Sequence, residues 1–136
     1  MNAHVSFISL GVRDLDRAKR FYGEGLGWPI HQDADGWVAF APSEGSSAIG
    51  LYPIEALAGD AGVEVNDDGL HGITFSYLVG SDERVNEVLA EAERAGARIV
   101  RPAERAAWGG YGGHFADPEG FLWKVVMATD GQPLAE

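Results

Sequence analysis

The chain has 136 residues, 46% of them apolar, which fits one globular domain because a chain of about 150 residues buries roughly 70% of its unfolded surface. It contains no cysteine, and this excludes disulfides, thiolate metal sites and a cysteine nucleophile. The formal charge of −11 excludes nonspecific binding to nucleic acid and to an anionic membrane surface, since the mean field of the protein repels both.

The first half of the chain predicts a strand, a helix and three further strands. Residues 5–12 are β-rich and partly alternating, which is typical of a strand. Asp14 can cap the helix that follows, and glycines end that helix. Three short apolar stretches, separated by the turn sequences DADG and PSEGS, then predict strands over 29–33, 36–41 and 47–53.

The second half predicts the same order of elements. A helical turn at 54–58 and an acidic, glycine-rich linker at 59–69 separate the two halves. Ser81 can cap the helix of this half, in which apolar residues recur at helical spacing before Gly96. The predicted strand, helix and three strands cover residues 71–79, 82–95, 97–101, 111–116 and 121–127.

A short repeat supports a duplication. The pattern Phe-Ala-x-x-Glu-Gly stands at 40–45 and again at 115–120, each time just before the last strand of its half. The chain is therefore predicted to be one domain made of two βαβββ modules, at about 4–58 and 70–127, followed by a frayed tail at 128–136.

The chain resembles the vicinal oxygen chelate superfamily, which includes glyoxalases, bleomycin resistance proteins and dioxygenases. The likeness is carried by FISLGVRDLDRAKRFYGEGLGW at 7–28 and by WGGYGGHFADPEGFLWKVV at 108–126, and it covers about residues 5–127. The resemblance implies an α+β fold in which two tandem βαβββ modules form a curved mixed sheet around a cavity. It also implies a homodimer, but it leaves the chemistry open because this fold hosts several activities.

Strand alternation predicts which side chains face that cavity. The inward set mixes small polar residues with aromatic ones, as small-molecule pockets do. Small polar residues can also simply face water, and the resemblance is what favours a pocket. The predicted ligand-binding residues on the strands are Phe7, Ser9, Trp37, Tyr52, Thr74 and Ser76.

The resemblance also implies a divalent metal in catalytic members, held by inward His or Glu side chains of four strands. The four matching positions here are Phe7, Gly50, Gly72 and Lys124, and none of these supplies a metal ligand. His4 and His71 lie nearby, but a shift of one residue turns a strand side chain to the other face of the sheet. We therefore expect no metal cofactor, and ordinary structural roles for His4 and His31.

His114 and Lys124 are the candidate catalytic residues. The imidazole of His114 can donate a hydrogen bond or move a proton near neutral pH, or it can merely fill the face of a sheet. Lys124 can hold a carboxylate or phosphate, or act as a base. Its alternative roles are a salt bridge to one of the many carboxylates and a solvent-exposed tip.

Residues 102–113 are predicted to be a glycine-rich loop that carries two aromatic residues. Trp108 and Tyr111 can form a lid that stacks on a flat ligand. Alternatively, they cover the core or contact the second subunit of a dimer.

The leading functional hypothesis is a metal-free protein that binds a small organic ligand, aromatic or antibiotic-like, by sequestration as in bleomycin resistance. The alternatives are a metal-dependent glyoxalase-like lyase or isomerase, a dioxygenase, a metal-free acid–base enzyme using His114 and Lys124, or a protein with a vestigial cavity that acts through partners. No targeting segment or bilayer-spanning run of ~20 apolar residues is visible, so we expect a cytoplasmic protein.

Overall fold

The computed structural model describes residues 1–65, 72–129 and 131–136. The first half of the chain contains β1 (Phe7–Val12), α1 (Leu15–Lys19), the π-helical segment η1 (Arg20–Gly25), β2 (Ile30–Ala34), β3 (Trp37–Phe40) and β4 (Ala48–Pro53). A connecting helix, α2 (Ile54–Ala61), follows. The second half contains β5 (Ile73–Val79), α3 (Asp82–Ala95), β6 (Arg98–Arg105), β7 (Tyr111–Ala116) and β8 (Leu122–Met127).

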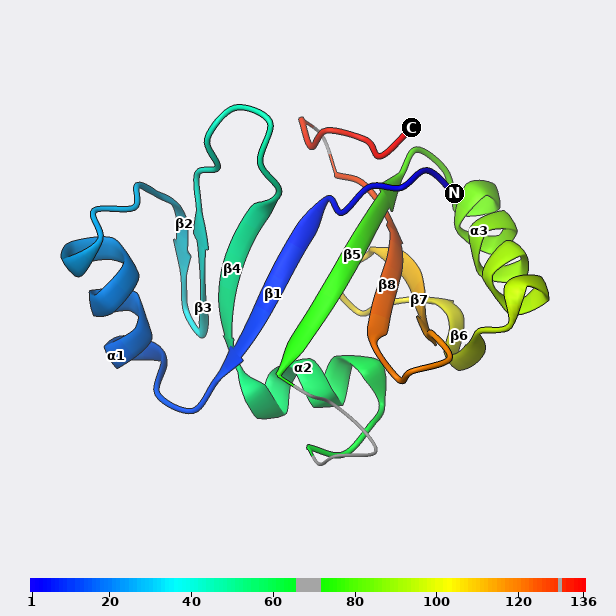
Figure 1. The fold of residues 1–136 in the computed structure, drawn as a ribbon, viewed down its shortest axis with the longest axis horizontal. Coiled ribbons are helices and arrows are strands. Elements are labelled where there is room, and N and C mark those ends of the chain that lie inside the picture. Colours follow the sequence, from blue (N-terminus) through cyan, green and yellow to red (C-terminus); the bar gives the residue numbers. More distant parts are fainter. Residues whose placement is uncertain (66–71, 130) are drawn as a thin grey trace.

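The two halves share one strand topology, which confirms the predicted fold class. All eight strands form a single mixed sheet in the order β2-β3-β4-β1-β5-β8-β7-β6 (Figure 1). In each half the first strand lies parallel to the last, and the other two strands continue antiparallel to the edge. An antiparallel pairing of β1 with β5 joins the halves at the centre of the sheet.

Two helical layers cover one face of the sheet. Residues of α1 and η1 pack on the buried Val38, Phe40 and Leu51 of the first half. In the second half, α3 is amphipathic and buries its apolar side against Tyr77 and Val125. Ser81 accepts a hydrogen bond from the third amide of α3, as expected for its cap. Among the described residues, no helix is long and apolar enough to cross a membrane.

The connecting helix α2 lies on the opposite, concave face of the sheet. Its buried residues Ile54, Leu57, Ala58 and Ala61 recur at helical spacing and contact side chains that β7 and β8 present on that face. The helix ends at Gly62, whose φ of 71° is readily adopted only by glycine. Residues 59–61, expected in the linker, therefore belong to α2, while 66–69 lie outside the described residues.

The expectation of a frayed tail at 128–136 is wrong for the described part of that segment. Ala135 is buried, and its amide donates to the carbonyl of Leu78 at 2.9 Å. Tyr77 is fully buried, and its hydroxyl donates to Glu136 at 2.8 Å while it accepts from the amide of Asn2 at 2.8 Å. The tail thus supplies the acceptor for the proton of this buried hydroxyl, and that contact holds the end of the chain against the second module.

Candidate functional site

Buried polar side chains gather on the concave face of the sheet. Among the described residues, the buried polar or charged ones are Ser9, Thr74, Ser76 and His114. Ser9 pairs with Thr74 across β1 and β5. Two residues further along β5, Ser76 pairs with Lys124 of β8, which pairs in turn with His114 of β7. The hydroxyl of Thr74 finds no hydrogen-bond partner among the described residues. The register of these strands therefore places the side chains of these residues on one face of the sheet.

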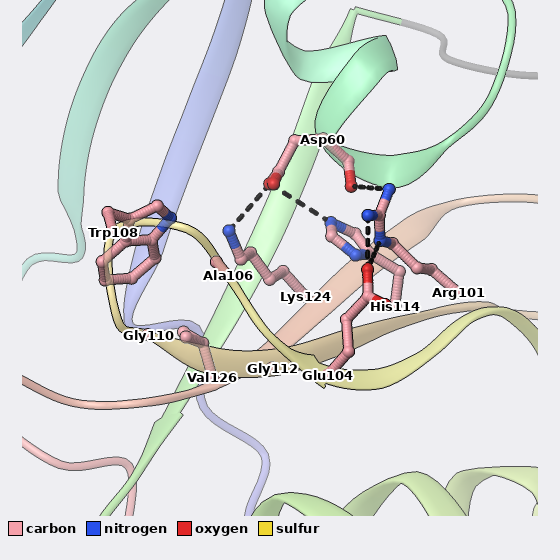
Figure 2. Close-up of a pocket in the computed structure, with 10 residues that line it drawn as sticks. All are labelled: Asp60, Arg101, Glu104, Ala106, Trp108, Gly110, Gly112, His114, Lys124 and Val126. Atoms are coloured by element: carbon pink, nitrogen blue, oxygen red, sulfur yellow. Dashed lines mark hydrogen bonds and ion pairs between the residues drawn. The ribbon is translucent and has the colours of Figure 1, made fainter.

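A small pocket lies at the second-module end of this face (Figure 2). Its walls come from β6, β7, β8, the turn between β6 and β7, and one residue of α2. Its volume is about 60 Å³, well below the roughly 300–1,000 Å³ of pockets that enclose drug-sized ligands. His114 and Lys124 both line it. The sequence led us to expect a cavity between the two modules. The helix α2 packs over the centre of the concave face, and the pocket lies within the second module instead.

Asp60 of α2 connects the two candidate catalytic residues. Its carboxylate oxygen Oδ2 accepts a hydrogen bond from Lys124 Nζ at 2.7 Å and lies 3.6 Å from His114 Nε2 (Figure 2). Burial raises the pKa of Asp60, but the neighbouring His114 imidazole and Lys124 ammonium lower it by more, so the carboxyl pKa lies well below its ordinary value. The Asp60 side chain is thus an anion between two nitrogen groups of the sheet.

His114 is held in one orientation by this arrangement. The residue is only 3% exposed, and its Nδ1 atom has no hydrogen-bond partner among the described residues. Nε2 faces the Asp60 carboxylate, so this ring nitrogen is the one placed to direct an N–H group at that oxygen. The sequence did not identify Asp60, whose position was assigned to the linker.

A second ion pair borders the pocket. Arg101 Nε donates to Glu104 Oε1 at 2.9 Å, and Arg101 Nη1 donates to the backbone carbonyl of Asp60 at 3.3 Å. Arg101 therefore links β6 to the last turn of α2. Neither residue was a candidate from the sequence: Arg101 ended the predicted strand 97–101, and Glu104 lay in the predicted loop 102–113.

Trp108 lies at the tip of a tight turn and borders the pocket. The amide of Ala106 donates to the carbonyl of Gly110 at 2.7 Å, and the amide of Gly109 donates back to Ala106 at 2.9 Å. The indole is 62% exposed and its ring centre lies 5.9 Å from Lys124 Nζ. The predicted loop 102–113 is therefore wrong, because β6 and β7 extend into it and leave only this turn.

Tyr111 lies on the other face of the sheet. Its hydroxyl donates to Asn86 of α3 at 2.8 Å, and its ring packs beside the guanidinium of Arg105 at 5.1 Å. Tyr111 precedes His114 by three residues on one strand, so alternation places the two side chains on opposite faces. Of the two aromatic residues predicted to form a lid, Trp108 borders the pocket and Tyr111 does not.

The predicted aromatic residues of the first module form a separate group. Trp37 and Tyr52 stack with ring centres 5.7 Å apart, and Tyr52 also packs against α2. The ring of Phe7 lies over Gly50, where an added Cβ would come within 2.7 Å of the ring. Burial raises the pKa of Tyr52, and the charge of Asp60 raises it further. These rings cover the concave face beside the pocket.

The residues at the four family metal positions do not fit a metal. Phe7 fills the space above Gly50, Lys124 carries a cation paired with Asp60, and the carbonyl of Gly72 accepts from the amide of Gly11 at 2.7 Å. Within 1–65, 72–129 and 131–136, no group of three or more His, Asp or Glu side chains could hold a metal ion. His71 lies outside the described residues. Metal content stays a prediction.

A second hollow of about 190 Å³ lies in the first module, beside Trp28, Phe40 and Pro42. Its lining contains serines and apolar residues but no charged side chain. It contains none of the residues predicted to bind a ligand or to act in catalysis.

The duplicated topology and the site on the concave face define a class of protein. The model of the Glyoxalase/Bleomycin resistance protein/Dioxygenase superfamily matches residues 3–125, and the chain belongs to this superfamily. No curated protein matches the chain.

Three solved structures show the same fold at low sequence identity. An NAD-dependent benzaldehyde dehydrogenase from Legionella pneumophila is 18% identical, with a TM-score of 0.69 over 90% of this chain and 98% of that one. A glyoxalase/bleomycin resistance protein/dioxygenase superfamily member from Vibrio splendidus 12B01 is 13% identical, with a TM-score of 0.60 over 90% of this chain and 97% of that one. An Mn(II)-bound glyoxalase from Novosphingobium aromaticivorans is 21% identical, with a TM-score of 0.58 over 90% of this chain and 38% of that one.

Proposed function

We propose that the protein binds a small aromatic molecule at the second-module pocket and holds it without turnover, in the manner of bleomycin resistance proteins. The observation that carries this proposal is the combination of an exposed indole, Trp108, with two polar groups beneath it, the buried His114 and the half-buried Lys124. A flat ring can stack on the indole while a polar substituent enters the pocket.

The size of the pocket supports a small ligand. A volume of about 60 Å³ accommodates a substituent and not a whole antibiotic. The exposed face of Trp108 extends the site outward, where a ring can lie. The mutual pairing of Lys124 and Asp60 supports binding without chemistry, because neither group is an unpaired base or acid.

The test is a titration with benzamide, a neutral aromatic probe, followed by the NMR signals of the tryptophan indole N–H groups. Trp108→Ala removes the stacking surface and is expected to weaken benzamide binding. Phe21→Ala, which removes an exposed aromatic ring at the other end of the fold, is the matched control and is expected to change nothing. Absence of benzamide binding to the unchanged protein would refute the proposal.

A second candidate, a metal-free acid–base enzyme, is favoured by one observation. The Asp60 carboxylate faces Nε2 of His114 at 3.6 Å, an arrangement that can orient an imidazole for proton transfer. If His114→Ala keeps full turnover on an identified substrate, this candidate is excluded. Elemental analysis of protein purified without chelator tests the metal-dependent alternatives, since a stoichiometric metal would overturn the argument from the ligand positions.

Assembly as a homodimer and a cytoplasmic location remain proposals. Light scattering coupled to size exclusion measures the mass of the assembly, and fractionation of cells measures the compartment. A monomer mass at all concentrations would refute the homodimer. Recovery of the protein outside the cytoplasmic fraction would refute the cytoplasmic location.

A further inference from the structure

The carboxylate of Asp60 stands where the polar group of a bound molecule would stand. It lies between Lys124 Nζ, at 2.7 Å, and His114 Nε2, at 3.6 Å, and all three groups border the pocket (Figure 2). Lys124 and His114 are fixed on neighbouring strands of the sheet, where they pair in register. Asp60 comes from a different layer, the last turn of the helix that covers the concave face.

The Asp60 side chain can leave this position without unfolding α2. It is 46% exposed, so a change of rotamer carries the carboxylate into solvent. The neighbouring Ala61 keeps the helix anchored, because it is fully buried against the sheet. Arg101 also holds the backbone carbonyl of Asp60, so the side chain can move while the helix stays.

When Asp60 swings out, the pocket becomes cationic. Among the described residues, Lys124 then has no carboxylate partner, and Arg101 remains balanced by Glu104. The buried His114 adds a donor at Nε2 beside the ammonium group. An ammonium donates up to three hydrogen bonds, and a carboxylate accepts from such donors more strongly than a neutral carbonyl does.

We propose that the pocket is an anion subsite, that Asp60 occupies it as an internal counter-ion, and that the bound molecule is an aromatic carboxylate which displaces Asp60 from Lys124 and His114. This proposal rests on the proposed function, since it requires the ring to stack on Trp108. A cationic ligand is disfavoured, because the Lys124 ammonium would repel it at close range.

The test compares benzoate with benzamide, two probes of nearly equal shape that differ in charge. NMR titrations measure both affinities in the unchanged protein, Asp60→Asn, Lys124→Gln and Glu55→Gln. Glu55 lies exposed in the first turn of α2, so its variant changes the net charge equally without touching the pocket. Thermal unfolding of each variant checks that the fold is retained.

Asp60→Asn is expected to raise the affinity for benzoate about tenfold, because the competing carboxylate is gone, and to change the affinity for benzamide less than about twofold. Glu55→Gln is expected to leave both within about twofold. Lys124→Gln is expected to weaken benzoate binding and to leave the affinity for benzamide unchanged. This comparison tests the proposal even if Asp60→Asn does not fold.

The outcomes separate this inference from the proposed function. If benzamide binds with dependence on Trp108, but benzoate gains nothing from Asp60→Asn and loses nothing in Lys124→Gln, the anion subsite is refuted and the proposed function stands. An equal gain for both probes in Asp60→Asn also refutes it, since the effect would not be one of charge. If neither probe binds any variant, both proposals fail.

Discussion

Gly110→Ala isolates the contribution of Trp108 to ligand binding. The indole of Trp108 lies directly on Gly110, and a Cβ at residue 110 would overlap its six-membered ring. Gly110 does not adopt a positive φ, so alanine fits the backbone there and only the indole has to move. The substitution therefore displaces the stacking surface while it leaves the turn and the pocket residues in place.

The expected magnitudes differ between binding and stability. An aromatic stacking contact contributes about 0.5–1.5 kcal/mol to binding. Displacement of the Trp108 indole from its position on Gly110 should therefore weaken benzamide binding about two- to tenfold. Because Trp108 is 62% exposed and packs little, the free energy of unfolding should change by less than about 1 kcal/mol.

NMR titration with benzamide measures the first quantity, and urea unfolding measures the second. Gly25→Ala is the control, because its added methyl group meets no atom closer than 3.7 Å and lies in the other module. If the Trp108 indole signal shifts but the affinity for benzamide stays constant, the stacking role assigned to Trp108 is wrong.

Three further substitutions test the fold by urea or thermal unfolding. Gly59→Ala should stabilise the protein by about 0.5–1 kcal/mol, since the methyl group of a helical alanine meets open space there. Gly113→Ala should destabilise it by about 1–3 kcal/mol, because the added Cβ would come within 2.8 Å of the Arg101 carbonyl oxygen. Hydrogen bonds from Arg84 and then Tyr77 lower the pKa of Glu136 to about 2, so its stabilising contribution, present above the ordinary carboxyl pKa, should fall away as the pH drops from about 5 towards 2. Glu136→Gln should flatten this part of the pH profile, and an unchanged profile would contradict the assignment.

Strand alternation accounts for the part of the site that the sequence predicted. His114 and Lys124 lie on strands whose alternate residues are large and apolar, so the inward face could be read from the pattern. The same rule places Tyr111 on the outward face. Residue 111 falls both in the predicted strand 111–116 and in the predicted loop 102–113, and treating it as part of the loop hid this. The metal positions could likewise be assessed from the sequence, because Gly50 and Phe7 have no ligand atoms.

Asp60 escapes sequence-based prediction because the pattern after residue 53 predicts one helical turn followed by a linker, not the full helix α2. The spacing of Ile54, Leu57, Ala58 and Ala61 is helical, and Gly62 is a typical helix end, so a signal for the full helix was present. The acidic and glycine-rich composition after residue 58 outweighed it. No local pattern shows that Asp60 reaches His114, because that contact depends on how α2 packs across the sheet.

The outer strand β6 was predicted too short for a different reason. Pro102 is typical of a strand end, yet β6 stands at the edge of the sheet and, within the described part of the chain, pairs only with β7. The pairing shifts register between Ile99 and Arg101 and again between Arg101 and Glu104, so Pro102 lies in an irregular stretch. A proline is compatible with such a stretch because no regular ladder hydrogen bond is required of its missing N–H group.

This irregular edge bears on how the protein stays in solution. A straight, unpaired edge strand recruits strands from other molecules and begins aggregation. At β6 the missing donor of Pro102, the register shifts and the charges of Arg98 and Arg105 all oppose such recruitment. The features that made this strand hard to recognise in the sequence thus also protect the sheet from growing beyond eight strands.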